Sequence, residues 1–398
     1  MNLRVTRFID KNIGIPICKI LTGLEKLKKI VTGSTKSNKE VQKILLMKFW
    51  GFGNILLLTP ALKAIRRRYP DAEITFLSLS ENSNLLKSLP VINKVLEIKA
   101  KRVHQFLIDA IKLVSYIKNQ KYDLVVDFEQ FARSSSIITY LSGAKERVGF
   151  NTEGQNRQGV YTKIVKYNND QHIVKTFFDL VRVLRCKTPD KYELMAPVFS
   201  KNDEKFVNKL LQDKNINLIV AMHPGTGPNA TVRRWPLENY AKLSDYLIEK
   251  HKSCIIYTGS KSEKNMIEDI INRMKNKNKV LNFAGILNFP QLSYLMTRIK
   301  LFISSDTGPL HLAASLKVKT ISFFGPNTPK IYGQWGKNHV VLYKHLKCSP
   351  CITNFNTKLV NCDKPYCILN ITAGEVINKI DDILKKEKEY KIPEKIGA

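Results

Sequence analysis

Apolar residues in the first half of this chain fall into short runs separated by amphipathic stretches. The runs predict buried strands at residues 44–49, 74–79, 94–98 and 124–128. The stretches between them have the spacing of helices, at residues 55–69, 82–89 and 103–119. Strands that alternate with helices in this way are typical of a parallel α/β sheet.

The alternation pauses near Pro197 and resumes after a helix predicted at residues 203–211. Further strands are predicted at residues 218–222, 254–257, 280–283, 301–303 and 320–324. The fold class is therefore α/β with two Rossmann-like domains, at residues 40–200 and 201–345. Ligands of open parallel sheets bind beyond the carboxyl ends of the strands, so we expect the two halves to face a shared cleft.

The first 39 residues have a different pattern. Apolar side chains at residues 13–31 recur at helical spacing with lysines between them, which predicts a basic amphipathic helix. Such a helix could lie on an anionic membrane surface or dock on the body of the protein. Residues 32–39 are small and polar, and we interpret them as a linker.

Charge is the unusual feature of the composition. The 398 residues include 65 Lys and Arg against 34 Asp and Glu, a formal net charge of +31. Phosphorylated substrates, an anionic membrane surface or nucleic acid could balance this excess. Nucleic acid is the weakest of these because no aromatic platform or reading element is recognisable. No apolar run is long enough to span a bilayer and the start lacks a signal-peptide pattern, so we expect a cytoplasmic protein.

The most informative segment joins a buried strand to a helix through a small polar turn. The turn contains Asp306, Thr307 and Gly308, and His311 follows one helical turn later. Free amides and the dipole at a helix start attract anions, so we predict a phosphate site with a nucleotide diphosphate as its ligand. The same residues fit an ordinary connection in which Asp306 or Thr307 caps the helix.

A second strand end in this half carries His223, Gly225 and Thr226, followed by Arg233 and Arg234. Glycine lets the backbone approach a ligand closely, and guanidinium groups pair with phosphate oxygens. A charged surface turn is the alternative interpretation.

A third strand end carries Gly259 and Glu263. The carboxylate of Glu263 is a candidate for the ribose hydroxyls of a nucleotide. It fits equally well as a support for the first turn of its own helix.

Several of these strings resemble the glycosyltransferase family 9 heptosyltransferases of lipopolysaccharide core assembly. The strings are HPGTG…RRWP, TGSKSE and SSDTGPLHLAAS, in this order, with KFWGFGNILLLTPALKAIRRRYP as the opening motif. The resemblance implies a GT-B fold with the nucleotide-sugar, ADP-heptose, in the C-terminal domain. It further implies an inverting, metal-independent transfer to a lipid-linked oligosaccharide on the inner face of the inner membrane.

The resemblance also implies residue roles. Arg233 would lie near the diphosphate and Glu263 near the ribose, while Asp306, Thr307, Gly308 and His311 would form the diphosphate loop.

One position departs from the family pattern. The family's opening turn usually reads Gly-Asp with the Asp as proposed general base, and this chain has Gly53-Asn54. An amide accepts a proton poorly, so Asn54 can at best orient the acceptor hydroxyl. Asp127 or Glu129 could replace the base, or a phosphorylated acceptor could activate itself. If the chemistry has been lost, the chain would be a non-catalytic nucleotide-sugar-binding protein.

Arg133 is one of several basic residues expected on the acceptor side, which suits a phosphorylated, lipid-linked oligosaccharide.

Four cysteines lie close together near the end of the chain, at Cys348, Cys351, Cys362 and Cys367. Their spacing favours a structural zinc site, while disulfides or free thiols fit the same pattern. This loop and the helix at residues 373–386 form the last predicted segment, residues 346–398. We expect that helix to pack back across the first domain.

Overall fold

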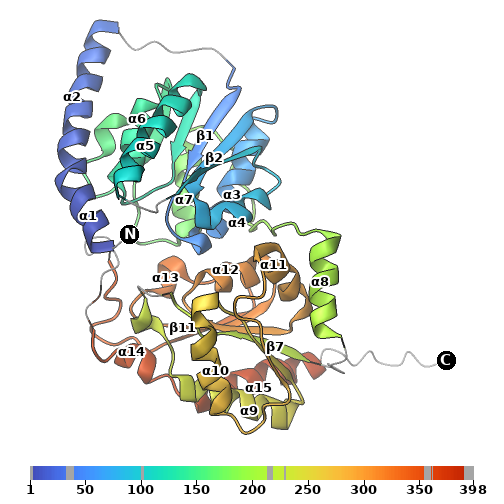
Figure 1. The fold of residues 1–398 in the computed structure, drawn as a ribbon. Helices are drawn as coiled ribbons and strands as arrows, with labels where there is room; N and C mark the ends of the chain where they lie inside the picture. Colours follow the sequence, from blue (N-terminus) through green and yellow to red (C-terminus); the bar gives the residue numbers. More distant parts are fainter. Residues whose placement is uncertain are drawn as a thin grey trace. The chain divides into compact units, whose positions relative to one another are not determined.

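A computed structural model describes residues 3–32, 40–99, 103–212, 218–227, 230–353, 360 and 362–389. The predicted linker lies almost wholly outside the described residues. The chain divides into two compact units, Met1–Val198 and Phe199–Ala398 (Figure 1).

Unit 1 contains one sheet of six parallel strands in the order β3-β2-β1-β4-β5-β6. The strands are β1 (Lys43–Met47), β2 (Glu73–Leu79), β3 (Lys94–Ile98), β4 (Leu124–Asp127), β5 (Glu146–Asn151) and β6 (Lys163–Lys166). The four strands predicted from the apolar runs are confirmed. The structure adds β5 and β6, which extend the sheet beyond β4.

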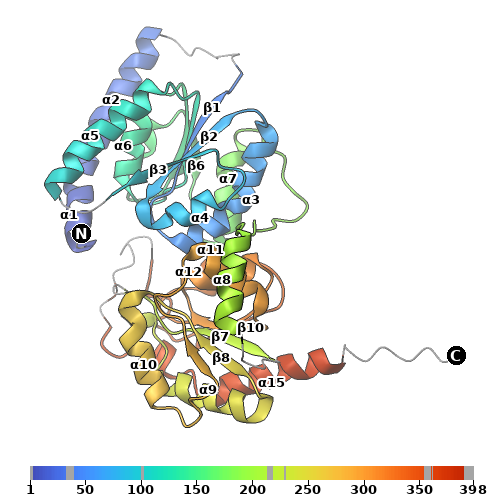
Figure 2. The same cartoon turned by 45° about the vertical axis from the view of Figure 1, so that its right-hand side comes forward.

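Helices cover both faces of this sheet (Figure 2). Helices α3 and α7 pack together on one face, and α5 packs beside α6 on the other. Their bounds are α3 (Phe52–Arg68), α4 (Ser83–Lys87), α5 (Val103–Asn119), α6 (Arg133–Leu141) and α7 (Ile173–Arg182). Two short 3-10 turns, η1 (Ser80–Asn82) and η2 (Gln158–Val160), complete the unit.

The chain begins with two helices, α1 (Leu3–Asn12) and α2 (Gly14–Thr32), which confirm the predicted N-terminal helix. Helix α2 packs on α6 and η2, so one of its faces docks on the protein body. Among the described helices, none combines the length and the apolar character needed to cross a bilayer.

Unit 2 repeats the arrangement with a second parallel six-stranded sheet in the order β12-β11-β10-β7-β8-β9. The strands are β7 (Ile219–His223), β8 (Cys254–Tyr257), β9 (Val280–Asn282), β10 (Leu301–Ser305), β11 (Lys319–Phe324) and β12 (His339–Tyr343). Five of these were predicted. Strand β12, which forms one edge of the sheet, was not predicted.

The helices of unit 2 again lie on both sides of their sheet (Figure 2). Helices α9 and α10 contact each other on one face, and α8, α11 and α12 group on the other. Their bounds are α8 (Lys201–Leu211), α9 (Leu237–His251), α10 (Lys264–Asn272), α11 (Phe289–Arg298), α12 (Gly308–Ser315) and α13 (Pro329–Tyr332). The 3-10 turns η3 (Thr231–Arg233) and η4 (Lys261–Glu263) precede α9 and α10.

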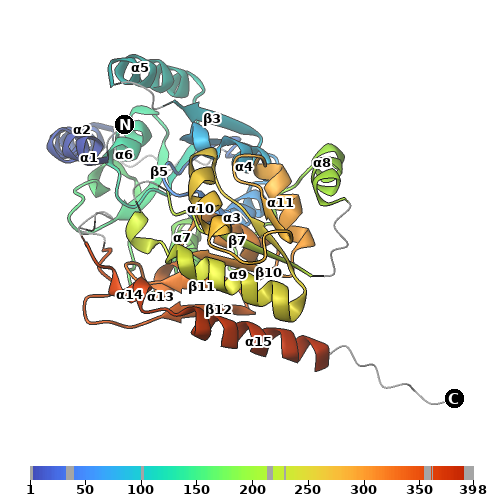
Figure 3. The same cartoon turned by 60° about the horizontal axis from the view of Figure 1, so that its bottom comes forward.

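The C-terminal segment contains α14 (Tyr366–Leu369) and α15 (Ala373–Glu389). The prediction that its helix packs across the first domain is wrong, because α15 packs against α9 within unit 2 (Figure 3). Val376, Ile380 and Leu384 are buried in the core of that unit. The indole nitrogen of Trp235 also donates to the carbonyl of Ile371, 2.7 Å away. The apolar face of α15 is therefore satisfied inside its own domain.

Each sheet reverses its strand order at its centre. In unit 1, β1 lies between β2 and β4, and in unit 2, β7 lies between β8 and β10. Loops on either side of such a reversal diverge at the carboxyl ends of the strands and leave room for a ligand. The register pairs Met47 with Asp127 and His223 with Ser304, which brings the polar strand ends of each unit side by side.

Candidate active site

In unit 2, the turn after β10 places backbone donors at the start of α12. Thr307 occupies the N-cap position with extended backbone angles, and its side chain makes no capping hydrogen bond. Its hydroxyl instead lies 2.8 Å from Ser304 Oγ. The first amides of α12 are thus not capped by that side chain, as the predicted anion site requires.

Asp306 does not cap α12. Its carboxylate accepts from Arg233 Nη1 at 3.0 Å and from Asn327 Nδ2 at 2.7 Å. Asp306 and Asn327 are buried, and Arg233 is largely so. The two contacts fix the guanidinium beside the start of α12, where a positive group would meet a phosphate.

The turns after β7 and β8 meet at Glu263. Its carboxylate accepts from the amide and hydroxyl of Ser260 at 2.8 Å each, which completes a capping box, and from the amide of Gly227 at 3.4 Å. Burial acts to raise the pKa of Glu263, but the backbone hydrogen bond from Ser260 and nearby His223 together outweigh it, so the pKa is lowered. Glu263 therefore supports its own turn, as one interpretation proposed, and also presents a carboxylate to the turn after β7.

Gly225 allows this meeting, because a Cβ there would lie 2.0 Å from Glu263 Oε1. His223 is buried at the end of β7, with Nδ1 3.1 Å from the hydroxyl of Thr258. Burial lowers the pKa of His223, so the ring is neutral at neutral pH.

Several buried polar atoms around these turns have no hydrogen-bond partner among the described residues. They are Thr226 Oγ1, Arg233 Nε, Arg234 Nε and Asn327 Oδ1. A buried polar atom without a partner costs about 1–3 kcal/mol, and a bound ligand could supply the missing hydrogen bonds here. Three of the four belong to residues predicted to hold the donor substrate.

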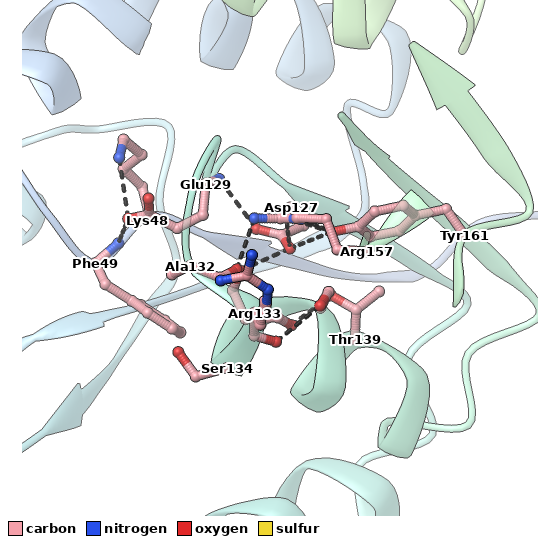
Figure 4. Close-up of polar contacts among 12 residues, drawn as sticks. Lys48, Phe49, Asp127, Glu129, Ala132, Arg133, Ser134, Thr139, Arg157 and Tyr161 are labelled. Atoms are coloured by element: carbon pink, nitrogen blue, oxygen red, sulfur yellow. Dashed lines mark hydrogen bonds and ion pairs between the residues drawn. The ribbon is translucent and has the colours of Figure 1, made fainter. Parts of the chain in front are cut away.

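In unit 1, the loop after β1 is held by a buried ion pair (Figure 4). Lys48 Nζ lies 2.9 Å from Glu129 Oε1, and both side chains are almost inaccessible. The same oxygen accepts from the amides of Phe49 at 2.6 Å and Trp50 at 2.8 Å. Glu129 thus fixes the backbone that leads into α3.

Asp127 lies beside Glu129 in a second buried network (Figure 4). Its Oδ2 accepts from Ser135 at 2.8 Å, Arg157 at 2.5 Å and Tyr161 at 2.7 Å, and its Oδ1 accepts from the amide of Glu129 at 3.0 Å. Burial raises the pKa of Asp127, while Arg157 and the hydrogen bonds act in the opposite direction. The Asp127 side chain is inaccessible to solvent in this conformation.

A family model for glycosyltransferase family 9 (heptosyltransferase) matches residues 110–359, which is more than half of the chain. This chain belongs to glycosyltransferase family 9. It is therefore a glycosyltransferase, and the resemblance found in the sequence motifs is confirmed.

Individual relatives agree with this assignment. The chain is 26% identical to lipooligosaccharide heptosyltransferase 2 of Campylobacter jejuni over 339 residues, 84% of this chain and 95% of that protein. Its fold is similar to that of a family 9 glycosyltransferase from Veillonella parvula, with a TM-score of 0.72 at 18% identity over 87% of this chain and 99% of the other. ADP-heptose lipopolysaccharide heptosyltransferase II of E. coli gives a TM-score of 0.70 at 18% identity over 87% and 100%. The predicted GT-B fold class is confirmed.

Asn54, which the motif resemblance pairs with the family's proposed base, lies in the first turn of α3. Gly51 precedes the helix with a φ of +89°, and a Cβ there would lie 2.8 Å from Asn54 Nδ2. Gly53 is buried in the same turn. The geometry places Asn54 directly after the loop that Glu129 holds, and the catalytic roles of Asn54, Asp127 and Glu129 stay predictions.

Arg133 starts α6 and was predicted to contact the acceptor. Its guanidinium forms an ion pair with Asp10 of α1 at 2.9 Å and donates to the carbonyls of Gly154 and Gln155. These contacts fix α1 to α6, and acceptor binding by Arg133 stays a prediction.

The four clustered cysteines have free thiols in this structure. Among the described residues no three His, Cys, Asp or Glu side chains gather in a way that could hold a metal ion, so the zinc prediction lacks support. Cys367 is buried against Gly325, and burial raises the pKa of its thiol to about 11. Burial also raises the pKa of Cys351.

Sequence reasoning missed Asn327 and the residues around Asp127. Asn327 follows β11, the neighbour of β10, so a polar residue just after a buried strand was an available signal. Arg157 and Tyr161 lie 30 and 34 residues beyond Asp127 with no motif linking them.

Proposed function

We propose that this chain transfers a heptose from ADP-heptose to the lipopolysaccharide core or a similar lipid-linked acceptor. The observation that carries the proposal is the set of buried, unpartnered polar atoms on Thr226, Arg233 and Arg234, with Arg233 held by Asp306 beside the start of α12. Anionic oxygens of a diphosphate would complete those bonds. The name of the similar E. coli heptosyltransferase II includes ADP-heptose, which supports the choice of donor.

Each donor-side residue has a role that follows from its contacts. Arg233 and Arg234 pair with the diphosphate, and the first amides of α12 donate to it. Asp306 is an anion and does not bind the diphosphate itself. It accepts hydrogen bonds from Arg233 and Asn327 and so orients the guanidinium of Arg233. Glu263 accepts from the ribose hydroxyls with the oxygen lone pairs that Ser260 and Gly227 leave available. His223, Gly225, Gly259, Thr307, Gly308 and His311 shape the loops around these groups.

The reaction we propose is an inverting displacement. The acceptor hydroxyl attacks the anomeric carbon from the side opposite ADP, and the bond from that carbon to the phosphate oxygen breaks, with its electron pair leaving on ADP. Preorganised donors stabilise that developing charge by about 3 kcal/mol each when well placed. Two arginines and the start of α12 supply positive potential there, so the transfer needs no metal ion.

The proton of the acceptor hydroxyl needs a destination. Asn54 orients the hydroxyl through its amide, since an amide does not take up the proton. Asp127 and Glu129 are both buried and engaged, and this geometry favours a positioning role for each: Glu129 holds the loop before Asn54, and Asp127 holds Glu129 through its amide. A phosphorylated acceptor could then receive the proton on its own phosphate.

The acceptor site lies in unit 1 in this proposal, around Gly53 and the basic residues of α3 and α6. The proposed acceptor is anchored in a membrane by its lipid. We therefore propose that the enzyme works as a peripheral protein on the inner face of the inner membrane.

The test is product formation. Purified protein is incubated with ADP-heptose and a heptose-deficient lipopolysaccharide acceptor. One sample contains EDTA to remove metal ions and one does not. The mass of the acceptor is then measured by mass spectrometry. We expect the mass of one heptose to be added equally in both samples, and proton NMR to show an inverted anomeric configuration. Binding of ADP-heptose without any transfer would contradict the proposal and indicate a non-catalytic binding protein.

A further inference from the structure

The N-terminal helix α2 has two apolar faces, and only one of them is covered. Its inner face contains Cys18 and Leu21, which are buried against the rest of unit 1. Cys18 Sγ lies 3.4 Å from Ser136 Oγ of α6, and a Cβ at Gly159 of η2 would collide with the side chain of Thr22. The absence of a side chain at Gly159 therefore lets α2 settle closely onto the protein.

The outer face carries a row of exposed apolar side chains, which we call the α2 stripe. Its members recur at three- and four-residue intervals and so share one side of the helix. They are Ile20, Leu24, Leu27 and Val31, with exposed fractions of 63%, 48%, 60% and 82%. Isolated exposed apolar residues are ordinary, but a continuous helical row of them marks a surface that meets something apolar.

In the two N-terminal helices, acidic side chains lie on the inner side and exposed lysines lie on the outer side. Residues 3–32 contain seven basic residues and only two acidic ones, Asp10 and Glu25. Glu25 is buried against Arg147 at 2.8 Å, and Asp10 pairs with Arg133 at 2.9 Å. Both acids are thus neutralised on the inner side, while Lys19 and Lys26 are exposed beside the stripe.

We propose that the α2 stripe docks this enzyme on an anionic phospholipid surface, with α2 lying in the plane of the membrane. Apolar side chains enter the boundary between headgroups and acyl chains, and flanking lysines contact lipid phosphates. A second copy of this chain fits less well, because pairing two stripes would bring like-charged lysines together. The proposal rests on the proposed function only in so far as a lipid-linked acceptor gives the docking a purpose.

The docked inner face keeps the stripe in a fixed orientation. Arg147 and Arg133 anchor α2 and α1 through ion pairs that are largely shielded from solvent. The stripe is therefore presented as a preformed surface and needs no folding on contact with lipid, which lowers the entropic cost of binding. Figure 3 shows α1 and α2 at the outer side of unit 1, beside α6.

The experiment is vesicle flotation with the full-length protein. Vesicles contain either phosphatidylcholine alone or phosphatidylcholine with about one quarter phosphatidylglycerol, so that the anionic headgroup is the only difference. The test variant is Ile20→Ser/Leu24→Ser/Leu27→Ser. The matched control is Ile111→Ser/Phe206→Ser, which removes exposed apolar side chains from α5 and α8.

We expect the wild type and the control to float with the anionic vesicles, and the triple variant to bind at least about tenfold more weakly. A second variant, Lys19→Glu/Lys26→Glu, should lose the preference for phosphatidylglycerol. Binding of the wild type should also weaken at about 1 M salt, where the Debye length falls to about 3 Å. Because all substituted residues are exposed, thermal melting should be unchanged.

Equal flotation of the triple variant and the wild type, or no flotation of the wild type, would overturn the proposal. A dimer in the wild type that the triple substitution breaks would assign the stripe to self-association instead. None of these readouts requires transferase activity. A failure of the proposed function and a failure of membrane docking are therefore distinguishable.

Discussion

At the scale of single residues, one buried carboxylate oxygen of Glu129 binds several groups. It receives the ammonium of Lys48 and two backbone amides of the loop that leads to Asn54. A base must reach the substrate with a free lone pair, whereas a positioning residue must hold its neighbours. The contacts of Glu129 meet the second requirement.

The variant Glu129→Gln leaves the buried ammonium of Lys48 without a counter-charge, so we expect a loss of stability of about 3 kcal/mol and a marked fall in kcat. The double variant Lys48→Met/Glu129→Gln removes both charges and should recover most of the stability and part of the activity. Urea unfolding and steady-state kinetics on all four proteins of the cycle measure this. A double variant that is stable but as inactive as the single one would instead identify Glu129 as the base.

Residue-level prediction from sequence succeeded where partners are close along the chain. Asp306, Thr307 and Gly308 form one turn, so their joint position was predictable. The contact of Asp306 with Arg233 spans 73 residues and that with Asn327 spans 21. Such pairings depend on which strands are neighbours, and no local pattern specifies that.

At the scale of elements, the turns after β7 and β8 depend on a glycine at their closest approach. A methyl group at Gly225 would overlap the carboxylate of Glu263 and displace it from Gly227. We expect Gly225→Ala to raise KM for the nucleotide-sugar roughly tenfold, because the ribose contact is lost, with little change in melting temperature. Gly374→Ala is the control, since a Cβ there meets only an atom 3.9 Å away. An unchanged KM in Gly225→Ala would exclude Glu263 from the donor site.

Element prediction was most reliable for the buried strands and least for the edges. The apolar runs of β1, β7 and β10 are buried and easily recognised. Strand β12, by contrast, is only partly buried, so its pattern differs little from that of a loop. The helix at residues 373–386 was predicted, but a helical pattern does not say which domain the helix packs against.

At the scale of the whole molecule, a buried histidine and a half-buried one connect stability with pH. Burial lowers the pKa of both His223 and His339, each in unit 2. A histidine in the unfolded chain has a pKa of about 6.5. Below that pH the unfolded chain binds protons that the folded imidazoles do not bind. The two histidines therefore contribute fully to stability above that pH. This contribution is lost as the pH falls towards their pKa values in the folded protein.

We expect the free energy of unfolding of unit 2 to decrease as the pH falls from 7.5 to 5.5, because both folded-state pKa values lie below the unfolded value of about 6.5. The variant His223→Gln should show a shallower dependence than the wild type. The variant His345→Asn, at an exposed position, should match the wild type. Urea unfolding at a series of pH values gives the slopes, and equal slopes in all three proteins would contradict this assignment.

The account depends most on the diphosphate site of unit 2. The deciding measurement is calorimetric titration of ADP into the wild type, Arg233→Ala and Arg273→Ala, the last removing an exposed arginine that pairs with Asp269 on α10. Loss of a charge-assisted contact, together with the uncompensated charge of Asp306, predicts roughly tenfold to hundredfold weaker binding for Arg233→Ala. Arg273→Ala should bind like the wild type. ADP that does not bind, or that binds all three proteins equally, would contradict the account.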